Sequence, residues 1–273
     1  MSSENKVVVP QEDVKKIEAA APAMAPAEPK KERKMLVVTS APMFYHDVIP
    51  WGTEALRILG EKTGAYSMVL DNRPAAFEKE NLAQFDAICF NNTCGDIFEG
   101  DELKQNLIDF VKSGKGFVGI HCSAHTFLDW PEYGLMHGAY SRSHPWVSET
   151  VTVNVEDPAH PCVKCLGKSF EIVDEIYEFY EEPYSRERLR VLASIDTTKT
   201  DMTKKEIERT DNDFALVWVQ SYGEGRVFFT AFGHYKELLW DPKMLAHYLA
   251  GIQFALGDLP ADTTPSAKLK GRA

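Results

Sequence analysis

The sequence lacks several features that would indicate particular classes of protein. No apolar run approaches the roughly 20 residues that span a bilayer, and the three valines from Val7 are too short for a secretory signal. Basic residues are few: 30 Lys and Arg stand against 41 Asp and Glu, a net charge of −11. This charge disfavours nucleic acid and anionic membrane as partners. We expect neither, and we expect a cytoplasmic protein.

Cysteine is also scarce, and no segment repeats. Five irregularly spaced cysteines do not form the pattern of a disulfide framework. With 44% hydrophobic and 26% charged residues, the composition is that of a globular protein large enough for one α/β domain.

The two ends of the chain differ in composition from the middle. Residues 1–34 are rich in Ala, Pro, Lys and Glu, so they offer little apolar surface to offset chain entropy and predict a disordered tail. Residues 259–273 predict a flexible C-terminal tail. The folded domain is therefore expected over residues 35–258.

Strand and helix patterns alternate in the first half of this domain, and strands dominate the second half. Strands are predicted over 35–40, 66–70, 85–90, 116–120, 150–155, 169–172, 189–194, 214–220 and 226–230, and helices over 51–62, 101–112 and 241–256. The alternation implies an α/β fold with a mostly parallel sheet and right-handed crossovers. In such a sheet, the ligand site lies at the carboxyl ends of the strands.

The stretch from Gly116 to Thr126 combines a buried strand with a tight turn. The turn places His121, Cys122, Ser123 and His125 within five residues. A strand that ends in such a turn presents its side chains at the sheet edge, as a nucleophile elbow does.

Histidines recur after predicted strands. Six of the eight lie at strand exits or in the loop after the fourth strand: His46, His121, His125, His137, His144 and His234. They could gather over one edge of the sheet. His160 lies in a proline-flanked loop and His247 inside a helix, so both are expected to be structural.

Four ordered motifs resemble the ThuA-like family, named for trehalose utilisation. They are Gly119–Ala124, Gly138–Pro145, Val173–Tyr177 and Gly223–His234. The resemblance implies the three-layer α/β/α sandwich of class I glutamine amidotransferases, which is flavodoxin-like, and a carbohydrate substrate.

The comparison with amidotransferases argues against their activity. Their nucleophilic cysteine follows a Gly-Ile pair, whereas here His121 follows Gly119 and Ile120, and Cys122 comes one place late. A shift of one residue at a strand end turns a side chain to the other face. The amidotransferase pattern also has a histidine and a glutamate near its C-terminus, and these resemble His234 and Glu237 here. Without a thiolate beside a histidine, glutamine hydrolysis has no nucleophile.

The histidines admit three interpretations. One is a divalent metal such as Zn²⁺, held by His46, His121, His125 or His234, with His144 as a further candidate and Glu175 or Asp47 as carboxylate. The second is metal-free acid/base catalysis by His121, His234 and Glu175. The third is a polar pocket without chemistry.

Other polar and aromatic residues near these motifs are candidates for substrate binding, because sugars present hydroxyls and apolar ring faces. They are Asp96, Tyr140, Arg142, His144 and Tyr177. We expect a hydrolase, lyase or isomerase that acts on trehalose or a keto-sugar derivative. The alternative is a sugar-binding or scaffold domain that has lost catalysis. The oligomeric state is open, a homo-oligomer included.

Overall fold

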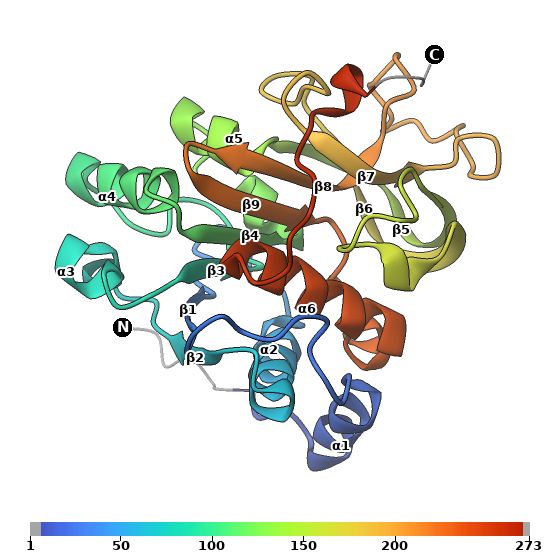
Figure 1. The fold of residues 1–273 in the computed structure, drawn as a ribbon. Coiled ribbons are helices and arrows are strands. Elements are labelled where there is room, and N and C mark those ends of the chain that lie inside the picture. The colour runs from blue at the N-terminus through green and yellow to red at the C-terminus, as the bar shows by residue number, and fades with distance from the viewer. Residues whose placement is uncertain (1–6, 270–273) are drawn as a thin grey trace.

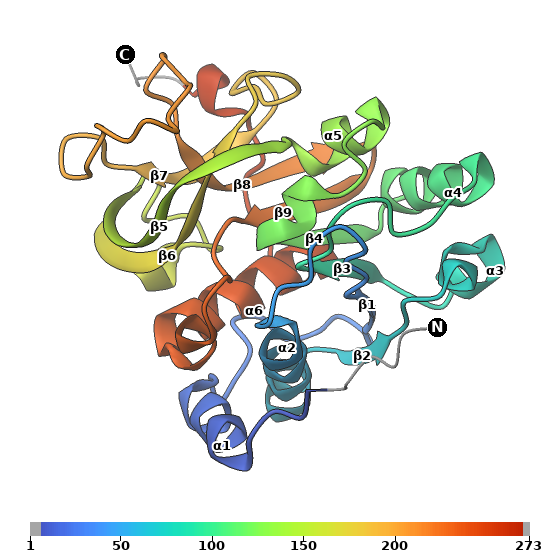
Figure 2. The same cartoon turned by 180° about the vertical axis from the view of Figure 1, so that it is seen from behind.

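The computed structural model describes residues 7–269 and contains one mixed sheet (Figures 1 and 2). Its strands run in the order β2-β1-β3-β4-β9-β8-β7-β5-β6. Their bounds are β1 Lys34–Val38, β2 Ser67–Leu70, β3 Ala87–Asn91, β4 Gly116–Ile120, β5 Ser141–Val155, β6 Ser169–Phe179, β7 Arg190–Ile195, β8 Ala215–Tyr222 and β9 Gly225–Thr230.

The sheet has a parallel half and an antiparallel half. Strands β2, β1, β3, β4 and β9 pair in parallel, whereas β9, β8, β7, β5 and β6 pair antiparallel. The predicted α/β class is confirmed, although the description "mostly parallel" fits only the first half. Hairpin turns can join antiparallel strands, so the strand-rich second half needs no crossover helices.

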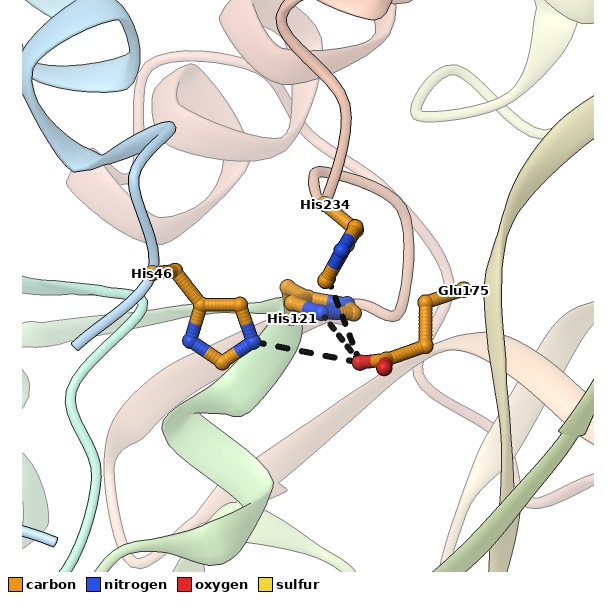
Figure 3. Close-up of side chains that lie close together, drawn as sticks. All are labelled: His46, His121, Glu175 and His234. Carbon is orange, nitrogen blue, oxygen red and sulfur yellow. Dashed lines mark ion pairs between the residues drawn. The ribbon is translucent and has the colours of Figure 1, made fainter. Parts of the chain in front are cut away.

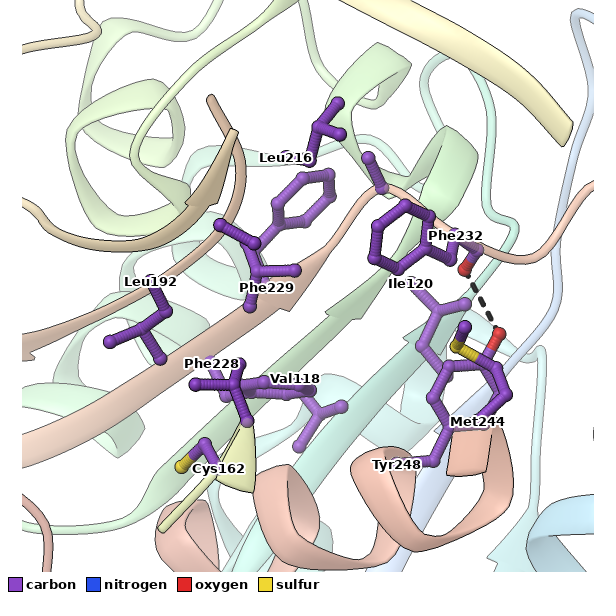
Figure 4. Close-up of a cluster of buried hydrophobic side chains, with 14 of the residues drawn as sticks. Val118, Ile120, Cys162, Leu192, Leu216, Phe228, Phe229, Phe232, Met244 and Tyr248 are labelled. Atoms are coloured by element: carbon purple, nitrogen blue, oxygen red, sulfur yellow. Dashed lines mark hydrogen bonds between the residues drawn. The ribbon is translucent and has the colours of Figure 1, made fainter. Parts of the chain in front are cut away.

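Helices cover both faces of the parallel half. Helices α1 (Gln11–Ala20), α2 (Ile49–Thr63) and α6 (Pro242–Leu256) lie on one side, and α3 (Lys79–Leu82), α4 (Asp101–Lys112) and α5 (Pro131–His137) on the other (Figures 1 and 2). Alternate residues of a strand serve the two layers: Met35 and Val37 belong to one buried cluster, Leu36 and Val38 to the other. Figure 4 shows part of the first cluster, where the Tyr248 hydroxyl of α6 donates to Phe232 O at 2.9 Å.

Predicted element bounds agree closely in the parallel half, where α4 and β4 begin and end at the predicted residues. The largest difference is in the antiparallel half. The motif around residues 138–145, expected to be a loop, forms the start of the 15-residue strand β5. Strand β6 likewise extends to Phe179. Both extensions carry site residues, so these side chains sit on sheet rather than on a loop.

The prediction of a disordered N-terminal tail is wrong for residues 7–34, while residues 1–6 lie outside the described part. Helix α1 buries Asp13 and Ile17 against the body, and Trp51 Nε1 donates a 2.9 Å hydrogen bond to the Asp13 carboxylate. Further along, Arg33 binds Asp258 through charged hydrogen bonds of 2.9 and 3.1 Å. The composition of the segment does not indicate this packing. The segment is anchored by a few separate contacts rather than by a continuous apolar run.

The predicted C-terminal tail is also packed over much of its described length. Ser266 N–H donates to Leu189 O at 2.9 Å, and Val191 N–H donates to Ser266 Oγ at 2.9 Å. These bonds occupy backbone groups around the start of β7. Residues 270–273 lie outside the described part. Within residues 7–269, no helix is long and apolar enough to cross a membrane.

Candidate functional site

The parallel strands bring three distant histidines to one edge of the sheet. His46 lies in the loop after β1, His121 directly follows β4, and His234 follows β9. Because β1, β3, β4 and β9 are parallel neighbours, their carboxyl ends meet at that edge. The prediction that these histidines share one edge is confirmed.

His121 occupies the elbow itself. Its φ is +49°, a left-handed conformation uncommon for a residue with a side chain. The ring is fully buried, and Nδ1 lies 2.7 Å from Ala231 O. A carbonyl oxygen only accepts, so Nδ1 carries the proton and Nε2 of the neutral ring presents a lone pair. Oη of Tyr177 lies 3.0 Å from the same Nε2.

Asp174 holds the backbone that carries His234. Its buried carboxylate accepts N–H bonds from Gly233 at 2.8 Å, His234 at 3.1 Å and Tyr235 at 3.3 Å. Gly233 has a φ of +137°, and an added Cβ would lie 2.9 Å from the Tyr248 hydroxyl, so the turn requires glycine. Burial raises the pKa of Asp174 to about 7, although the N–H bonds oppose that shift.

Glu175, the next residue of β6, connects the three histidines (Figure 3). Its Oε2 lies 3.2 Å from His121 Nε2, 3.3 Å from His234 Nδ1 and 3.8 Å from His46 Nε2. One ligand atom from each of the four residues lies within 4.8 Å of the others. Opposite this part of β6, the pairing of β5 is irregular between Trp146 and Glu149, and such bulges re-aim side chains. We call His46, His121, Glu175 and His234 the His–Glu cluster.

The cluster has an unbalanced proton count. His121 Nε2 has a lone pair and faces a carboxylate oxygen, with no proton of its own to place between them. Two acceptors at this distance are stable only if a cation or a proton lies nearby. Three nitrogens and one oxygen that converge in this way could hold a divalent metal ion, whose preferred ligands they are.

The pKa values show how strongly these groups interact. Burial lowers the pKa of His121 to about 4, with Glu175 opposing the shift. Burial alone would raise the pKa of Glu175, but contacts with His121, His234 and His46 outweigh it and hold that pKa well below its usual range. Burial would lower the pKa of His234, yet its contact with Glu175 raises it. In the absence of a metal, His234 is therefore the natural carrier of the compensating proton.

Two cavities meet at the cluster. The first, of about 570 Å³, is lined by His46, Glu175 and Tyr177 and also by Arg142 and His144. The second, of about 410 Å³, lies on the side of His46, His234, Trp51 and Lys236. His46 lines both, so the cluster is reachable from a ligand-sized hollow rather than sealed in the core.

Not every predicted site residue reaches this place. His125 lines the first cavity but is outside the His–Glu cluster, since its Nδ1 lies 2.8 Å from Ser141 Oγ. Asp96 is exposed and lines neither cavity. Tyr140 is buried in the core, where its hydroxyl donates to Phe127 O at 2.9 Å and to Trp130 O. The structure therefore gives no support to the substrate-binding predictions for Asp96 and Tyr140, because the first residue is exposed away from both cavities and the second packs in the core.

The other predicted binding residues do line the first cavity. Arg142 pairs with Glu208, and the His144 side chain is 58% exposed, with Nδ1 3.8 Å from Glu175 Oε1. Tyr177 stacks on His121 with ring centroids 4.5 Å apart. His160 and His247, predicted to be structural, are buried with protein partners.

Several lining residues escaped the sequence reasoning: Met43, Phe44, Cys94, Ser141, Ser143 and Glu206. Asp174 lies within the motif Val173–Tyr177, but no local sequence pattern indicates that it positions the backbone of His234. Met43 and Phe44 lie three and two residues before His46, in the loop that follows β1. Their closeness in sequence to a candidate histidine could have indicated that they line the same site.

Cys122 is poorly suited to be a nucleophile. It is 4% exposed, and its contact with Cys94, together with burial, raises the pKa of its thiol. The elbow position belongs to His121, as the sequence predicted.

This fold and cluster define an α/β protein with a histidine- and carboxylate-lined pocket at its sheet edge. The sequence pattern of the ThuA family, described as trehalose utilisation, matches residues 34–255, and the chain belongs to that family. No curated protein matches the sequence.

Solved structures share the fold. A ThuA-like protein from Bacteroides uniformis is similar with a TM-score of 0.70 and 20% identity, over 89% of this chain and 99% of that one. One from Parabacteroides merdae has a TM-score of 0.62 and 18% identity, over 85% and 93%. The cytoplasmic protein STM3548 from Salmonella typhimurium has a TM-score of 0.53 and 12% identity, over 82% and 98%.

Proposed function

We propose that this chain is a metal-dependent enzyme that acts on a carbohydrate, trehalose or a keto-sugar derivative. The observation that carries the proposal is the His–Glu cluster: four ligand atoms from four separate segments lie within 4.8 Å of one another beside a cavity of about 570 Å³. Burying three imidazoles against one carboxylate is costly unless a cation compensates them.

The donor set favours a first-row divalent ion such as Zn²⁺. Imidazole nitrogens suit Zn, Fe, Cu and Ni, and a single carboxylate supplies one negative charge. His121 is preset for ligation, because its Nδ1 proton is committed to Ala231 O and its neutral Nε2 points into the cluster. An ion held there would polarise a substrate oxygen or lower the pKa of a bound water.

The substrate class rests on the family description and on the cavity. The family is described by trehalose utilisation, and the cavity wall offers Arg142, Ser143 and His144 as hydrogen-bonding groups. Such groups suit the hydroxyls of a sugar. Hydrolysis, elimination and isomerisation of a sugar derivative all move a proton next to an oxygen that must be polarised.

The residues divide into two roles under this proposal. His46, His121, Glu175 and His234 hold the ion, and the exposed His144 is the group best placed to exchange protons with a substrate. In a metal-free version, His121, His234 and Glu175 would transfer protons themselves. His234 would then carry the mobile proton, consistent with its raised pKa.

We also propose a cytoplasmic location. Two solved structures of similar fold, both from Salmonella typhimurium, are described as cytoplasmic proteins. The proposal holds for a monomer or a homo-oligomer, because all four residues of the cluster lie in one chain and no second chain is needed to complete it.

The test combines elemental analysis of purified protein with calorimetric titration of Zn²⁺ and Mn²⁺, followed by trehalose. Wild type should bind one equivalent of metal, and His121→Ala should bind none while it keeps a wild-type circular dichroism spectrum. His144→Ala is the matched control, because it alters the same cavity but leaves the cluster intact, so it should retain metal. Equal metal binding by wild type and His121→Ala would overturn the metal centre. Sugar binding that needs no metal would favour either metal-free acid/base catalysis or a non-catalytic binding domain, and turnover of the bound sugar would separate these two.

A further inference from the structure

Three large apolar side chains stand exposed in a row beside the cluster. Met43, Phe44 and Tyr45 are 62%, 58% and 50% exposed. They lie in the loop between β1 and α2, directly before the buried His46. We call Met43–Tyr45 the apolar platform. Contiguous exposed apolar side chains usually mark a binding surface, because their exposure to water is unfavourable.

The platform borders both cavities. Met43 and Phe44 line the cavity of about 570 Å³, and Phe44 and Tyr45 line the one of about 410 Å³. The Phe44 ring packs edge-to-face on His46, with centroids 4.8 Å apart. Phe44 therefore forms part of the wall of the first cavity next to the His–Glu cluster.

The loop that carries the platform is held in place by Cys94 and Gly95, which follow β3. Met43 N–H donates to Cys94 O at 3.4 Å, and Cys94 N–H donates to Ser40 O at 3.3 Å. Gly95, with a φ of +79°, lies so close that an added Cβ would stand 2.8 Å from Met43 Cβ. These contacts place the apolar surface before any ligand arrives, which reduces the entropy lost on binding.

The same cavity presents hydrogen-bonding groups from another part of the fold. Ser141, Ser143 and His144 of β5 line it together with Met43 and Phe44. One cavity therefore combines an aromatic surface with hydroxyl-binding groups. A pyranose ring has this amphipathic character, with C–H groups on its faces and hydroxyls around its rim.

We propose that Phe44 is the stacking surface for a pyranose ring held at the His–Glu cluster, and that Met43 extends this contact. The proposal deepens the proposed function and rests on it. It assigns recognition of the ring face to the loop after β1, and recognition of the hydroxyls to β5. Phe44 is thus a specificity-determining residue, separate from the metal ligands.

The experiment measures binding of trehalose and of methyl α-D-glucopyranoside to Zn²⁺-loaded protein by calorimetry. Phe44→Ala should weaken sugar binding about 10-fold or more, equivalent to about 1.4 kcal/mol. Phe44→Leu should lose most of the same affinity, because it is apolar but has no ring face, whereas Phe44→Trp should retain it. Leu135→Ala is the matched control, since Leu135 is 38% exposed and lines neither cavity.

Zn²⁺ titration of the same variants distinguishes failure of the Phe44 stacking proposal from failure of the proposed metal-dependent function. Phe44→Ala should bind Zn²⁺ as wild type does. Unchanged sugar affinity in Phe44→Ala, with metal binding intact, would overturn the platform and leave the proposed function standing. Equal affinity of the Leu and Trp variants would overturn ring stacking. No saturable binding of either sugar to metal-loaded wild type would overturn the carbohydrate function and the platform with it.

Discussion

Oε2 of Glu175 lies 3.2 Å from Nε2 of His121, although the proton of that ring is committed to Ala231 O on its other side. The two acceptors need a positive charge between or beside them. This relationship distinguishes the cluster from an ordinary histidine–carboxylate hydrogen bond, in which the ring would donate to the acid.

Glu175→Gln should therefore weaken metal binding strongly. The amide keeps the size of the side chain but removes the negative charge, and loss of a direct ligand should exceed the roughly 10- to 100-fold effect of outer-shell changes. Competition with a fluorescent chelator for Zn²⁺ would measure the change. Glu206→Gln, which alters an exposed carboxylate of the same cavity, is the control and should keep wild-type affinity. Similar Zn²⁺ affinity in both variants would show that Glu175 is not a ligand.

Helix α1 should contribute to stability. Ile17 is fully buried against the body, and replacing a buried isoleucine by alanine costs about 2–5 kcal/mol. We expect Ile17→Ala to lower the free energy of unfolding by about 2 kcal/mol, the lower limit, because a peripheral helix can relax. Val8→Ala, at a site 83% exposed, should have no measurable effect. Urea denaturation would compare the two, and equal midpoints for Ile17→Ala and wild type would mean that α1 is not docked in solution.

Cys122 should react slowly with thiol reagents at pH 7. The Cys94 contact and burial raise the pKa of its thiol, so little thiolate is present. Mass spectrometry after alkylation should find Cys122 unmodified in native protein and modified after denaturation. Cys122→Ser should also bind Zn²⁺ as wild type does. Rapid native labelling, with loss of activity in the serine variant, would instead support a thiol enzyme.

His247 should make the fold sensitive to acid. Its ring is fully buried between Cys162 O at 2.7 Å and Thr230 Oγ1 at 3.1 Å, and burial lowers its pKa to about 4. As pH falls, His247 is protonated in the unfolded state before it is protonated in the folded state. Its contribution to the free energy of unfolding is therefore fully present above about pH 6.5 and is lost as pH falls toward 4. Between pH 7 and pH 5 the loss should be about 2 kcal/mol.

His247→Gln tests this contribution, because glutamine has no titratable group and can still reach polar partners. Its free energy of unfolding should fall less steeply between pH 7 and pH 5 than that of wild type. His144→Gln is the control, since His144 is largely exposed, and its pH dependence should follow wild type. A parallel pH dependence for His247→Gln and wild type would show that His247 is not held neutral by burial.

Local patterns were enough to predict the parallel half of the fold. Buried strands have strong signals of their own, and so do helices such as Asp101–Lys112, which has acidic residues in its first turn and a lysine in its last. The rule that parallel strands share a carboxyl edge then placed His46, His121 and His234 together. The start of β5 was missed because Gly138 and Pro145 suggest a loop, and only pairing with β6 makes that segment a strand.

The sequence by itself determined the alternation of elements, the family motifs and the histidine at the elbow. The tertiary structure decided which polar residues meet. Glu175 joins the histidines because β5 and β6 extend the sheet past its parallel half, whereas His125 turns to Ser141 and Tyr140 points into the core. It also decided that α1 packs, because Asp13 and Trp51 are 38 residues apart and meet only in the fold. Strand exits can be read from local periodicity, but side-chain direction and long-range contacts depend on packing between segments distant in sequence.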